Sequence, residues 1–134
     1  MVEPLTNRKL LSLKRCIDRV KITLPASASA LNADIDAQDI ISLNLQRAVQ
    51  LCVDLAYSQI ANAKLKVPDT MAAAFATLGD ADLLPDDVVA SMQSAVGFRN
   101  LSVHQYDEVD WDIVYAICTK HLADFQHFAA ALQT

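Results

Sequence analysis

The chain has 134 residues, of which 53% are hydrophobic and 20% charged, and it contains only two glycines and four prolines. Average usage would give about 16 glycines and prolines at this length. The composition therefore disfavours a β-sandwich or barrel and excludes a collagen-like, disordered or disulfide-stapled chain. The glycines stand 18 positions apart, which excludes the clustered glycines of a P-loop or dinucleotide-binding fingerprint. These numbers predict an all-α protein with a single domain over residues 1–134.

Charge is spread unevenly along the chain, whose formal net charge is −5. Residues 1–24 hold six basic and two acidic groups, whereas the other 110 residues hold five basic and 14 acidic groups. An acidic protein of this kind is not expected to coat nucleic acid non-specifically, because that requires many lysines and arginines. The basic first segment is nevertheless a candidate for steering RNA or for contacting a partner protein, although a simply solvated face is the more ordinary interpretation.

The three cysteines, Cys16, Cys52 and Cys118, are odd in number, far apart and without a CxxC pair. Buried thiols in a reducing cytoplasm are the better interpretation of this pattern. No uncharged apolar run approaches the length of a membrane span, and no signal peptide is evident. We therefore expect a cytoplasmic protein without membrane association.

Apolar residues that recur every three or four positions predict the helices. The first helix ends before Pro25, and its apolar stripe consists of Leu10, Leu13, Ile17, Val20 and Leu24. Residues 26–33 are small and polar and are expected to form a connector. A long second helix is expected to begin with Asp34 or Asp36 as its N-cap and to run to about Leu65.

Three further helices complete the predicted architecture. A short alanine-rich helix is expected to be capped by Asp69 or Thr70 and to end at Gly79, and the next begins near Pro85. The last helix is expected to follow Asp110, with an apolar stripe made of Val114, Cys118, His121, Phe125, Phe128 and Leu132. Four principal helices and one short helix with this spacing predict an antiparallel up-and-down bundle.

Two histidines in the last helix raise the question of a metal site. His121 falls within the apolar stripe, which favours a hydrogen-bonded core histidine, and His127 lies off the stripe and is expected in solvent. They are six positions apart rather than four, with no nearby cysteine, so neither a metal site nor a cofactor is expected.

Residues suited to chemistry are concentrated near the end of the fourth predicted helix. Arg99 is the only lysine or arginine between Lys66 and Lys120, and His104 and Tyr106 follow within eight residues. Guanidinium binds phosphate bidentately and stays charged, while imidazole exchanges protons near neutral pH. Taken one at a time, each residue also has an ordinary structural interpretation: a helix-end arginine, a surface histidine and a packing tyrosine.

Together these residues spell R-x4-H-x-Y, the signature of the HEPN superfamily in the branch that contains the HepT toxins, and Asn100 after the arginine also fits. The chain resembles this family over residues 5–133. The resemblance implies a HEPN-like bundle and a metal-independent endoribonuclease toxin of a toxin–antitoxin pair. It further implies that Arg99 and His104 are catalytic, that Asn100 supports them, and that a cognate nucleotidyltransferase antitoxin silences the toxin by transferring AMP to Tyr106.

The chemistry also suggests that two copies are needed. RNA supplies its own 2′-OH nucleophile, so cleavage requires a proton acceptor, a proton donor and stabilisation of the phosphorane's charge. One His104 does not easily serve as acceptor and donor at once. On a continuous helix, Arg99 and His104 would stand roughly 140° apart. We therefore expect a homodimer or higher homo-oligomer with a composite site at a two-fold interface.

Several alternatives remain open at this point. Asn44 and Arg47, on the polar face of the second helix, either line the active-site cleft or form a structural network. Gly97 precedes Arg99 by two residues and is expected to permit an unusual turn or a close backbone approach. The rival function is a non-catalytic accessory subunit that presents substrate to a nucleotidyltransferase, with Arg99 binding a nucleotide phosphate. A purely structural dimerisation bundle is a weaker option.

Overall fold

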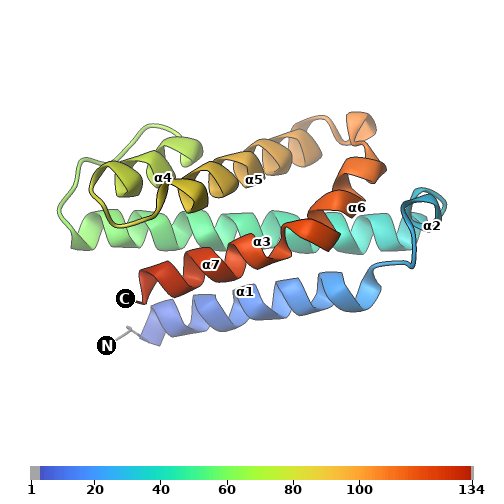
Figure 1. The fold of residues 1–134 in the computed structure, drawn as a ribbon, viewed down its shortest axis with the longest axis horizontal. Coiled ribbons are helices and arrows are strands. Elements are labelled where there is room, and N and C mark those ends of the chain that lie inside the picture. Colours follow the sequence, from blue (N-terminus) through green and yellow to red (C-terminus); the bar gives the residue numbers. More distant parts are fainter. Residues whose placement is uncertain (1–3, 134) are drawn as a thin grey trace.

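Helices account for the whole architecture of residues 4–133, which are the residues described by the computed structural model (Figure 1). The elements are α1 (Pro4–Thr23), α2 (Ala28–Asn32), α3 (Ile35–Asn62), α4 (Met71–Asp80), α5 (Asp86–His104), the 3-10 helix η1 (Tyr106–Glu108), α6 (Trp111–Lys120) and α7 (Leu122–Leu132). Successive long segments run in opposite directions: α1, α3, α5, and then α6 with α7. The predicted all-α, up-and-down bundle is confirmed.

The core forms around α3, which packs against α1, α4, α5 and α7. The predicted stripe of α1 faces this core, because Leu13, Ile17 and Val20 are buried. From the opposite side, Phe75 of α4 and Phe128 of α7 meet edge to face with ring centroids 5.4 Å apart. The apolar residues that recur every three or four positions in α1 are thus the ones buried in the core. Their burial is the main source of stability for helices in a bundle.

The expected N-terminal caps are present at three helices. Side-chain oxygens accept hydrogen bonds from backbone N–H groups: Asp34 from Ala37 (3.0 Å), Thr70 from Ala73 (3.1 Å) and Asp110 from Asp112 (2.9 Å). Each such cap is typically worth about 1 kcal/mol. The cap position of α5 is Pro85, whose side chain makes no cap hydrogen bond. The carboxylates of Asp86 and Asp87 in the first turn instead interact favourably with the positive end of the helix dipole.

The predicted connector and the predicted end of the long helix differ from the structure. The 26–33 connector contains α2, which Ser27 caps by accepting from Ala30 N at 3.1 Å and whose Leu31 is fully buried. The prediction missed it because one apolar residue in a short polar run carries no periodicity. α3 ends at Asn62, three residues early, because Lys64 adopts a left-handed conformation (φ 58°) and Leu65 N donates back to Ile60 O at 3.0 Å.

The predicted last helix is broken in two at His121, whose backbone (φ −123°) leaves the helical region. The predicted core position of His121 is therefore wrong: its side chain is 58% exposed and pairs with Asp124, with 3.2 Å between Nδ1 and Oδ2. Leu122 is buried in place of His121, whereas the stripe positions Val114, Cys118, Phe125 and Phe128 are buried as predicted. His127 is exposed, as predicted.

Gly97 lies inside α5 with helical geometry and is exposed. A Cβ added there would meet no atom within 4 Å. The predicted unusual turn or close backbone approach at Gly97 is thus absent from this chain, and the residue instead leaves a bare spot on the surface of α5. Across residues 4–133, no helix combines the length and apolar character needed to cross a membrane.

Candidate functional site

The R-x4-H-x-Y motif spans the end of α5 and the start of η1. Arg99 and Asn100 lie in the last turns of α5, His104 is its final residue, and Tyr106 opens η1. Gln105 is the C-cap of the helix: its N–H still donates to Leu101 O at 2.8 Å, while its backbone (φ −138°, ψ 51°) leaves the helical region. The motif is therefore carried by a regular helix up to the histidine and by a sharp change of direction after it.

Arg99 and His104 do not converge within one chain. Because α5 is continuous between them, the two side chains point roughly 140° apart around the helix axis. Arg99 Nη1 donates to Asn100 Oδ1 at 3.2 Å, while His104 is exposed and has no hydrogen bond or ion pair with any residue in 4–133. Asn100 thus orients the guanidinium, and the imidazole is left available for an external group.

Tyr106 is held in place by a residue of α3, the second long helix of the bundle. Its hydroxyl group donates to Asp39 Oδ1 at 2.8 Å, and its ring packs edge-on against Trp111 with centroids 5.8 Å apart. Burial raises the pKa of the Tyr106 phenol, the carboxylate of Asp39 raises it further, and the Ser42 hydroxyl opposes them by lowering it. The residue nevertheless remains 38% exposed, so the phenol is fixed in position yet reachable from solvent.

Sequence reasoning did not single out Asp39 or Ser42. They stand more than 60 residues from Tyr106, and nothing in the spacing of the motif points to them. Polar residues also recur along the rest of this helix, so Asp39 and Ser42 do not stand out in the sequence. Ser42 Oγ is buried and makes no hydrogen bond of ordinary geometry within residues 4–133.

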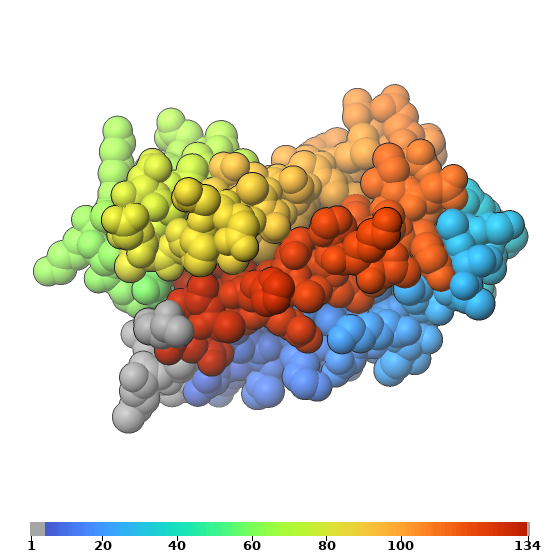
Figure 2. Space-filling view, viewed as in Figure 1, coloured from blue at the N-terminus to red at the C-terminus, as the bar shows by residue number. Residues whose placement is uncertain are grey.

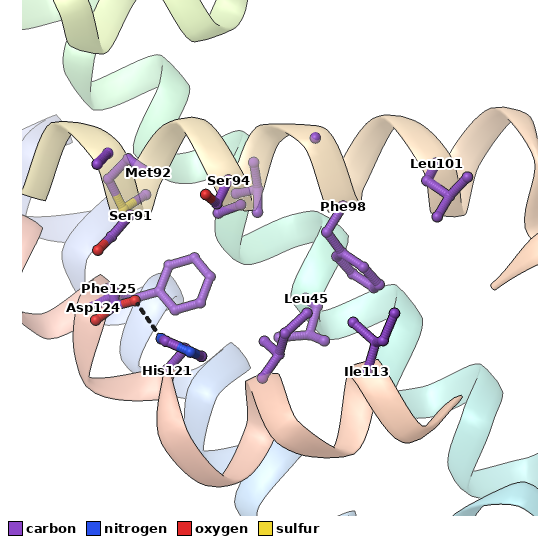
Figure 3. Close-up of a pocket in the computed structure, with 15 residues that line it drawn as sticks. Leu45, Ser91, Met92, Ser94, Phe98, Leu101, Ile113, His121, Asp124 and Phe125 are labelled. Carbon is purple, nitrogen blue, oxygen red and sulfur yellow. Dashed lines mark hydrogen bonds and ion pairs between the residues drawn. The ribbon is translucent and has the colours of Figure 1, made fainter. Parts of the chain in front are cut away.

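An apolar pocket of about 570 Å³ lies beside the exposed face of α5 (Figure 3). Its walls come from α5 on one side and α6 and α7 on the other, with Leu45 of α3 at its base. In the space-filling view the surface is hollowed between α5 and the red-orange α6–α7 segment (Figure 2). Gly97 and Phe98 line the pocket, and Gly97 shares a helical face with His104 because they are seven residues apart.

A second depression, of about 590 Å³, lies between α1 and α3 and is basic. Arg15, Arg19 and Arg47 line it and form no ion pair with another described residue, unlike Lys9, which pairs with Asp54 at 3.3 Å. We call these three arginines and their surroundings the arginine groove. Its further polar lining residues are Ser12, Asn44 and Gln50.

Asn44 and Arg47 therefore line a groove, but one that contains none of the motif residues. Asn44 is buried and donates to Ile40 O of its own helix at 2.8 Å, which is a structural role, while Arg47 is exposed. The groove and the Tyr106 contact nevertheless occupy neighbouring sides of α3, because Asp39 and Ile40 are consecutive.

No group of three or more metal-ligating side chains occurs within the described part of the chain. The acidic residues around Tyr106 have other roles: Asp110 caps α6, and Asp112 accepts a hydrogen bond from Asn32 at 2.9 Å. Asp107 and Glu108 remain exposed on η1. The chemistry available at this end of the bundle is that of arginine, histidine, tyrosine and carboxylate side chains.

Solved structures define the class to which this fold and motif belong. A crystal structure of a toxin–antitoxin complex with AMP-PNP is similar at a TM-score of 0.92 and 29% identity, over 98% of this chain and 99% of that one. A tri-AMPylated Shewanella oneidensis HEPN toxin in complex with MNT antitoxin gives 0.93 and 30% identity, over 98% of both chains. The Bacillus subtilis protein YutE, at 12% identity and a TM-score of 0.76, shares the fold alone. The fold is that of the HEPN toxins.

Sequence comparison then identifies the family. The profile described as Ribonuclease HepT-like matches residues 13–132. The mRNA nuclease HepT of Shewanella oneidensis is 32% identical over 120 residues, which cover 90% of each chain. This chain belongs to the HepT-like ribonuclease family. The predicted family and the predicted class of enzyme are confirmed.

Proposed function

We propose that this chain is the endoribonuclease toxin of a toxin–antitoxin pair, and that it cleaves RNA with Arg99 and His104 at a site built from two copies. The observation that carries the proposal is the placement of the motif: His104 is exposed and unpartnered among the described residues at the end of α5, and Asn100 orients Arg99 on another face of the same helix. The similarity to an mRNA nuclease supports RNA as the substrate class.

The proposed reaction is attack of a ribose 2′-oxygen on the adjacent phosphorus. The bond from phosphorus to the 5′-oxygen breaks, leaving a cyclic phosphate and a free 5′-hydroxyl group. One His104 takes the 2′-OH proton and the other protonates the leaving oxygen, while Arg99 stabilises the extra negative charge of the phosphorane. No step in this scheme requires a metal ion or cofactor.

A second copy is proposed to dock on the exposed face of α5. That face carries Gly97 in line with His104 and borders the apolar pocket, so a partner helix could approach closely and fill it. Because Arg99 and His104 diverge within one chain, a two-fold arrangement is the simplest way to bring the arginine of one copy to the histidine of the other.

Silencing is proposed to occur by transfer of AMP to Tyr106 by a cognate nucleotidyltransferase antitoxin. Two similar structures support this: one is an AMPylated HEPN toxin with its antitoxin, and the other is a complex with an ATP analogue. Each AMP adds a negative phosphodiester two residues from His104, beside the exposed Asp107 and Glu108. The added charge and bulk would repel RNA from the site.

The arginine groove is proposed to hold RNA phosphates on their way to the site. Its three arginines form no ion pair with another described residue, although the protein is acidic overall. Guanidinium groups of this kind bind phosphates through paired hydrogen bonds and charge. We place this activity in the cytoplasm, where RNA and ATP occur, and treat residues 1–134 as one HEPN-like domain.

The decisive experiment is cleavage of RNA by the purified protein in EDTA. Wild-type protein is expected to cut, and His104→Ala to reduce the rate by at least about 100-fold, since general acid–base groups contribute at least that much. His127→Ala is the matched control, because His127 is also an exposed histidine but lies on α7. If the wild-type protein cut no RNA and its expression without the antitoxin did not arrest cell growth, the function of a non-catalytic accessory subunit would replace this one.

The proposed modification has its own test. Co-expression with the antitoxin is expected to raise the chain mass by whole AMP units, and Tyr106→Phe is expected to abolish the gain. Tyr57 and Tyr115 are internal controls, because both hydroxyl groups donate to backbone carbonyls. A Tyr106→Phe chain that gained the same mass would refute the assignment.

A further inference from the structure

We propose that Asp39 is the proton acceptor for the transfer of AMP to Tyr106, so that the toxin chain itself supplies the base its own modification requires. The proposal rests on the proposed function in one respect, namely that Tyr106 is the modified residue. It assigns a catalytic role to a carboxylate on α3 that lies outside the R-x4-H-x-Y motif.

The geometry is that of a general base already in contact with its proton. Tyr106 Oη donates to Asp39 Oδ1 at 2.8 Å, which is within the range for direct proton transfer. Trp111 packs against the edge of the phenol ring, and the buried Ser42 lies on the same side of α3 as Asp39, one turn away. The phenol is therefore held in one orientation from α3 and α6, while its exposed side remains open to an incoming phosphate.

The proposed step balances as a phosphoryl substitution. Tyr106 Oη bonds to the α-phosphorus of a nucleoside triphosphate, and the bond from that phosphorus to the bridging α–β oxygen breaks. Pyrophosphate leaves with the electron pair, and the phenolic proton passes to Asp39 Oδ1. Asp39 is exposed, so it returns the proton to solvent before the next cycle.

A base is needed because the phenol is protonated in the resting protein. Burial and the neighbouring carboxylate both raise the pKa of Tyr106, so little phenolate forms near neutral pH. The proton must then leave as the new bond forms, and the acceptor must be in place beforehand. Of the acidic residues near Tyr106, Asp39 is the one with a hydrogen bond to its hydroxyl group, whereas Asp107 and Glu108 extend from η1 into solvent.

The test measures how fast the first AMP is added, using the full-length chain, its own antitoxin and ATP, with intact mass as the readout. Asp39→Asn keeps an oxygen that accepts the Tyr106 hydrogen bond but cannot take the proton, and we expect the rate to fall by about 100-fold. Asp39→Glu restores a carboxylate and is expected to recover most of the rate. Asp36→Asn removes a neighbouring exposed carboxylate from the first turn of α3 and serves as the matched control.

Two further measurements separate proton transfer from a loss of structure. The thermal midpoint and the affinity for the antitoxin are expected to be unchanged in Asp39→Asn. The alkaline absorbance titration of Tyr106, obtained by difference from Tyr106→Phe, is expected to shift to lower pH in Asp39→Asn, because the carboxylate that raises its pKa is gone. An unshifted titration would contradict the hydrogen bond on which the proposal stands.

The outcomes distinguish this proposal from the function on which it rests. If wild-type chains gain AMP on Tyr106 and Asp39→Asn gains it equally fast, Asp39 is not the acceptor and the modification itself stands. A slow Asp39→Asn accompanied by an equally slow Asp39→Glu would show that shape rather than proton transfer matters, and would also overturn the proposal. If wild-type chains gain no mass, or Tyr106→Phe gains it, the modification site fails and this inference fails with it.

Discussion

Among the single residues of the candidate site, Tyr106 links the proposed RNA cleavage with its proposed control. The phenol lies two positions from His104, is fixed by Asp39 at 2.8 Å and retains 38% exposure. A group attached to it is therefore held next to the proposed acid–base residue. Arg99 differs, because among the described residues its guanidinium group is hydrogen-bonded to its neighbour Asn100 alone, at 3.2 Å. The proposed function uses these side chains for binding and reaction.

Substitution of two arginines in the arginine groove tests whether the groove binds RNA. In a His104→Ala background, where RNA stays intact, Arg15→Gln with Arg47→Gln is expected to weaken binding of single-stranded RNA. The slope of log affinity against log salt should become less steep by about 0.7 for each RNA phosphate that the protein no longer neutralises. Fluorescence anisotropy over a salt series measures both quantities.

The control for this prediction changes the same amount of charge elsewhere. Lys64→Gln with Lys66→Gln removes two exposed positive charges just beyond the C-terminal end of α3. We expect this variant to bind RNA almost as the parent does. Equal weakening by the two double variants would mean that net charge acts at a distance and that the groove holds no phosphate.

Among the helices, α5 carries the proposed catalytic residues and remains a regular helix as far as His104. Its buried side consists of Val88, Met92, Val96 and Ser102. Its exposed side bears Gly97 and borders the apolar pocket that α6 and α7 complete. A helix with a bare spot in line with the proposed catalytic histidine is suited to contact with another helix. The η1 turn then redirects the chain so that Tyr106 meets α3.

Two substitutions of Gly97 test the proposed contact of α5 with a second copy. Gly97→Ala is expected to raise the free energy of unfolding by about 0.5–1 kcal/mol, because it replaces an exposed mid-helix glycine and meets nothing. Gly97→Leu should leave the folded chain intact yet hinder close approach of a second copy. We expect it to lower the RNA cleavage rate by at least about tenfold, the equivalent of 1.4 kcal/mol in assembly.

Sedimentation velocity and thermal unfolding together test this pair of variants. The expected pattern is a dissociated, folded Gly97→Leu protein and an associated, more stable Gly97→Ala protein. A Gly97→Leu protein that self-associates and cuts RNA like the wild type would place the contact between copies on a different face.

In the molecule as a whole, the helices of one chain form a stable support for a site that, under the proposed function, a second copy completes. One hydrophobic cluster extends through all the long helices, with Cys16, Cys52 and Cys118 as buried free thiols within it. Burial raises the pKa of Cys118 to about 12, so this thiol remains protonated and unreactive near neutral pH. Under the proposed function, the exposed His104 and the divergent Arg99 make catalysis dependent on how copies assemble.

Mixed dimers test this dependence directly. Wild-type and His104→Ala chains with different affinity tags are co-expressed, and tandem purification isolates dimers that contain one of each. Because the proposed site uses one His104 as proton acceptor and the other as proton donor, the mixed dimer lacks one of the two groups and is expected to cut RNA at least about 100-fold more slowly than the wild type. A mixed dimer that keeps about half of the wild-type rate would mean that each copy carries its own complete site.

Local information was enough for most of the long helices and for the motif. Caps at Asp34, Thr70 and Asp110 were predictable because they depend on residues within one turn. Likewise, the burial of α1 follows from spacing alone. The break at His121 was not predictable in this way, because the apolar pattern continues across it and only packing against the rest of the bundle selects Leu122 for the core.

Contacts between residues far apart in the sequence determine the surroundings of the motif and the arginine groove. Apolar periodicity and the order of Arg99, His104 and Tyr106 are properties of neighbouring residues, so they can be seen before folding. The Asp39–Tyr106 hydrogen bond joins residues 67 positions apart, and the arginine groove joins α1 to α3. Neither leaves a local pattern, because each exists only after burial of the apolar faces has set which helices lie side by side.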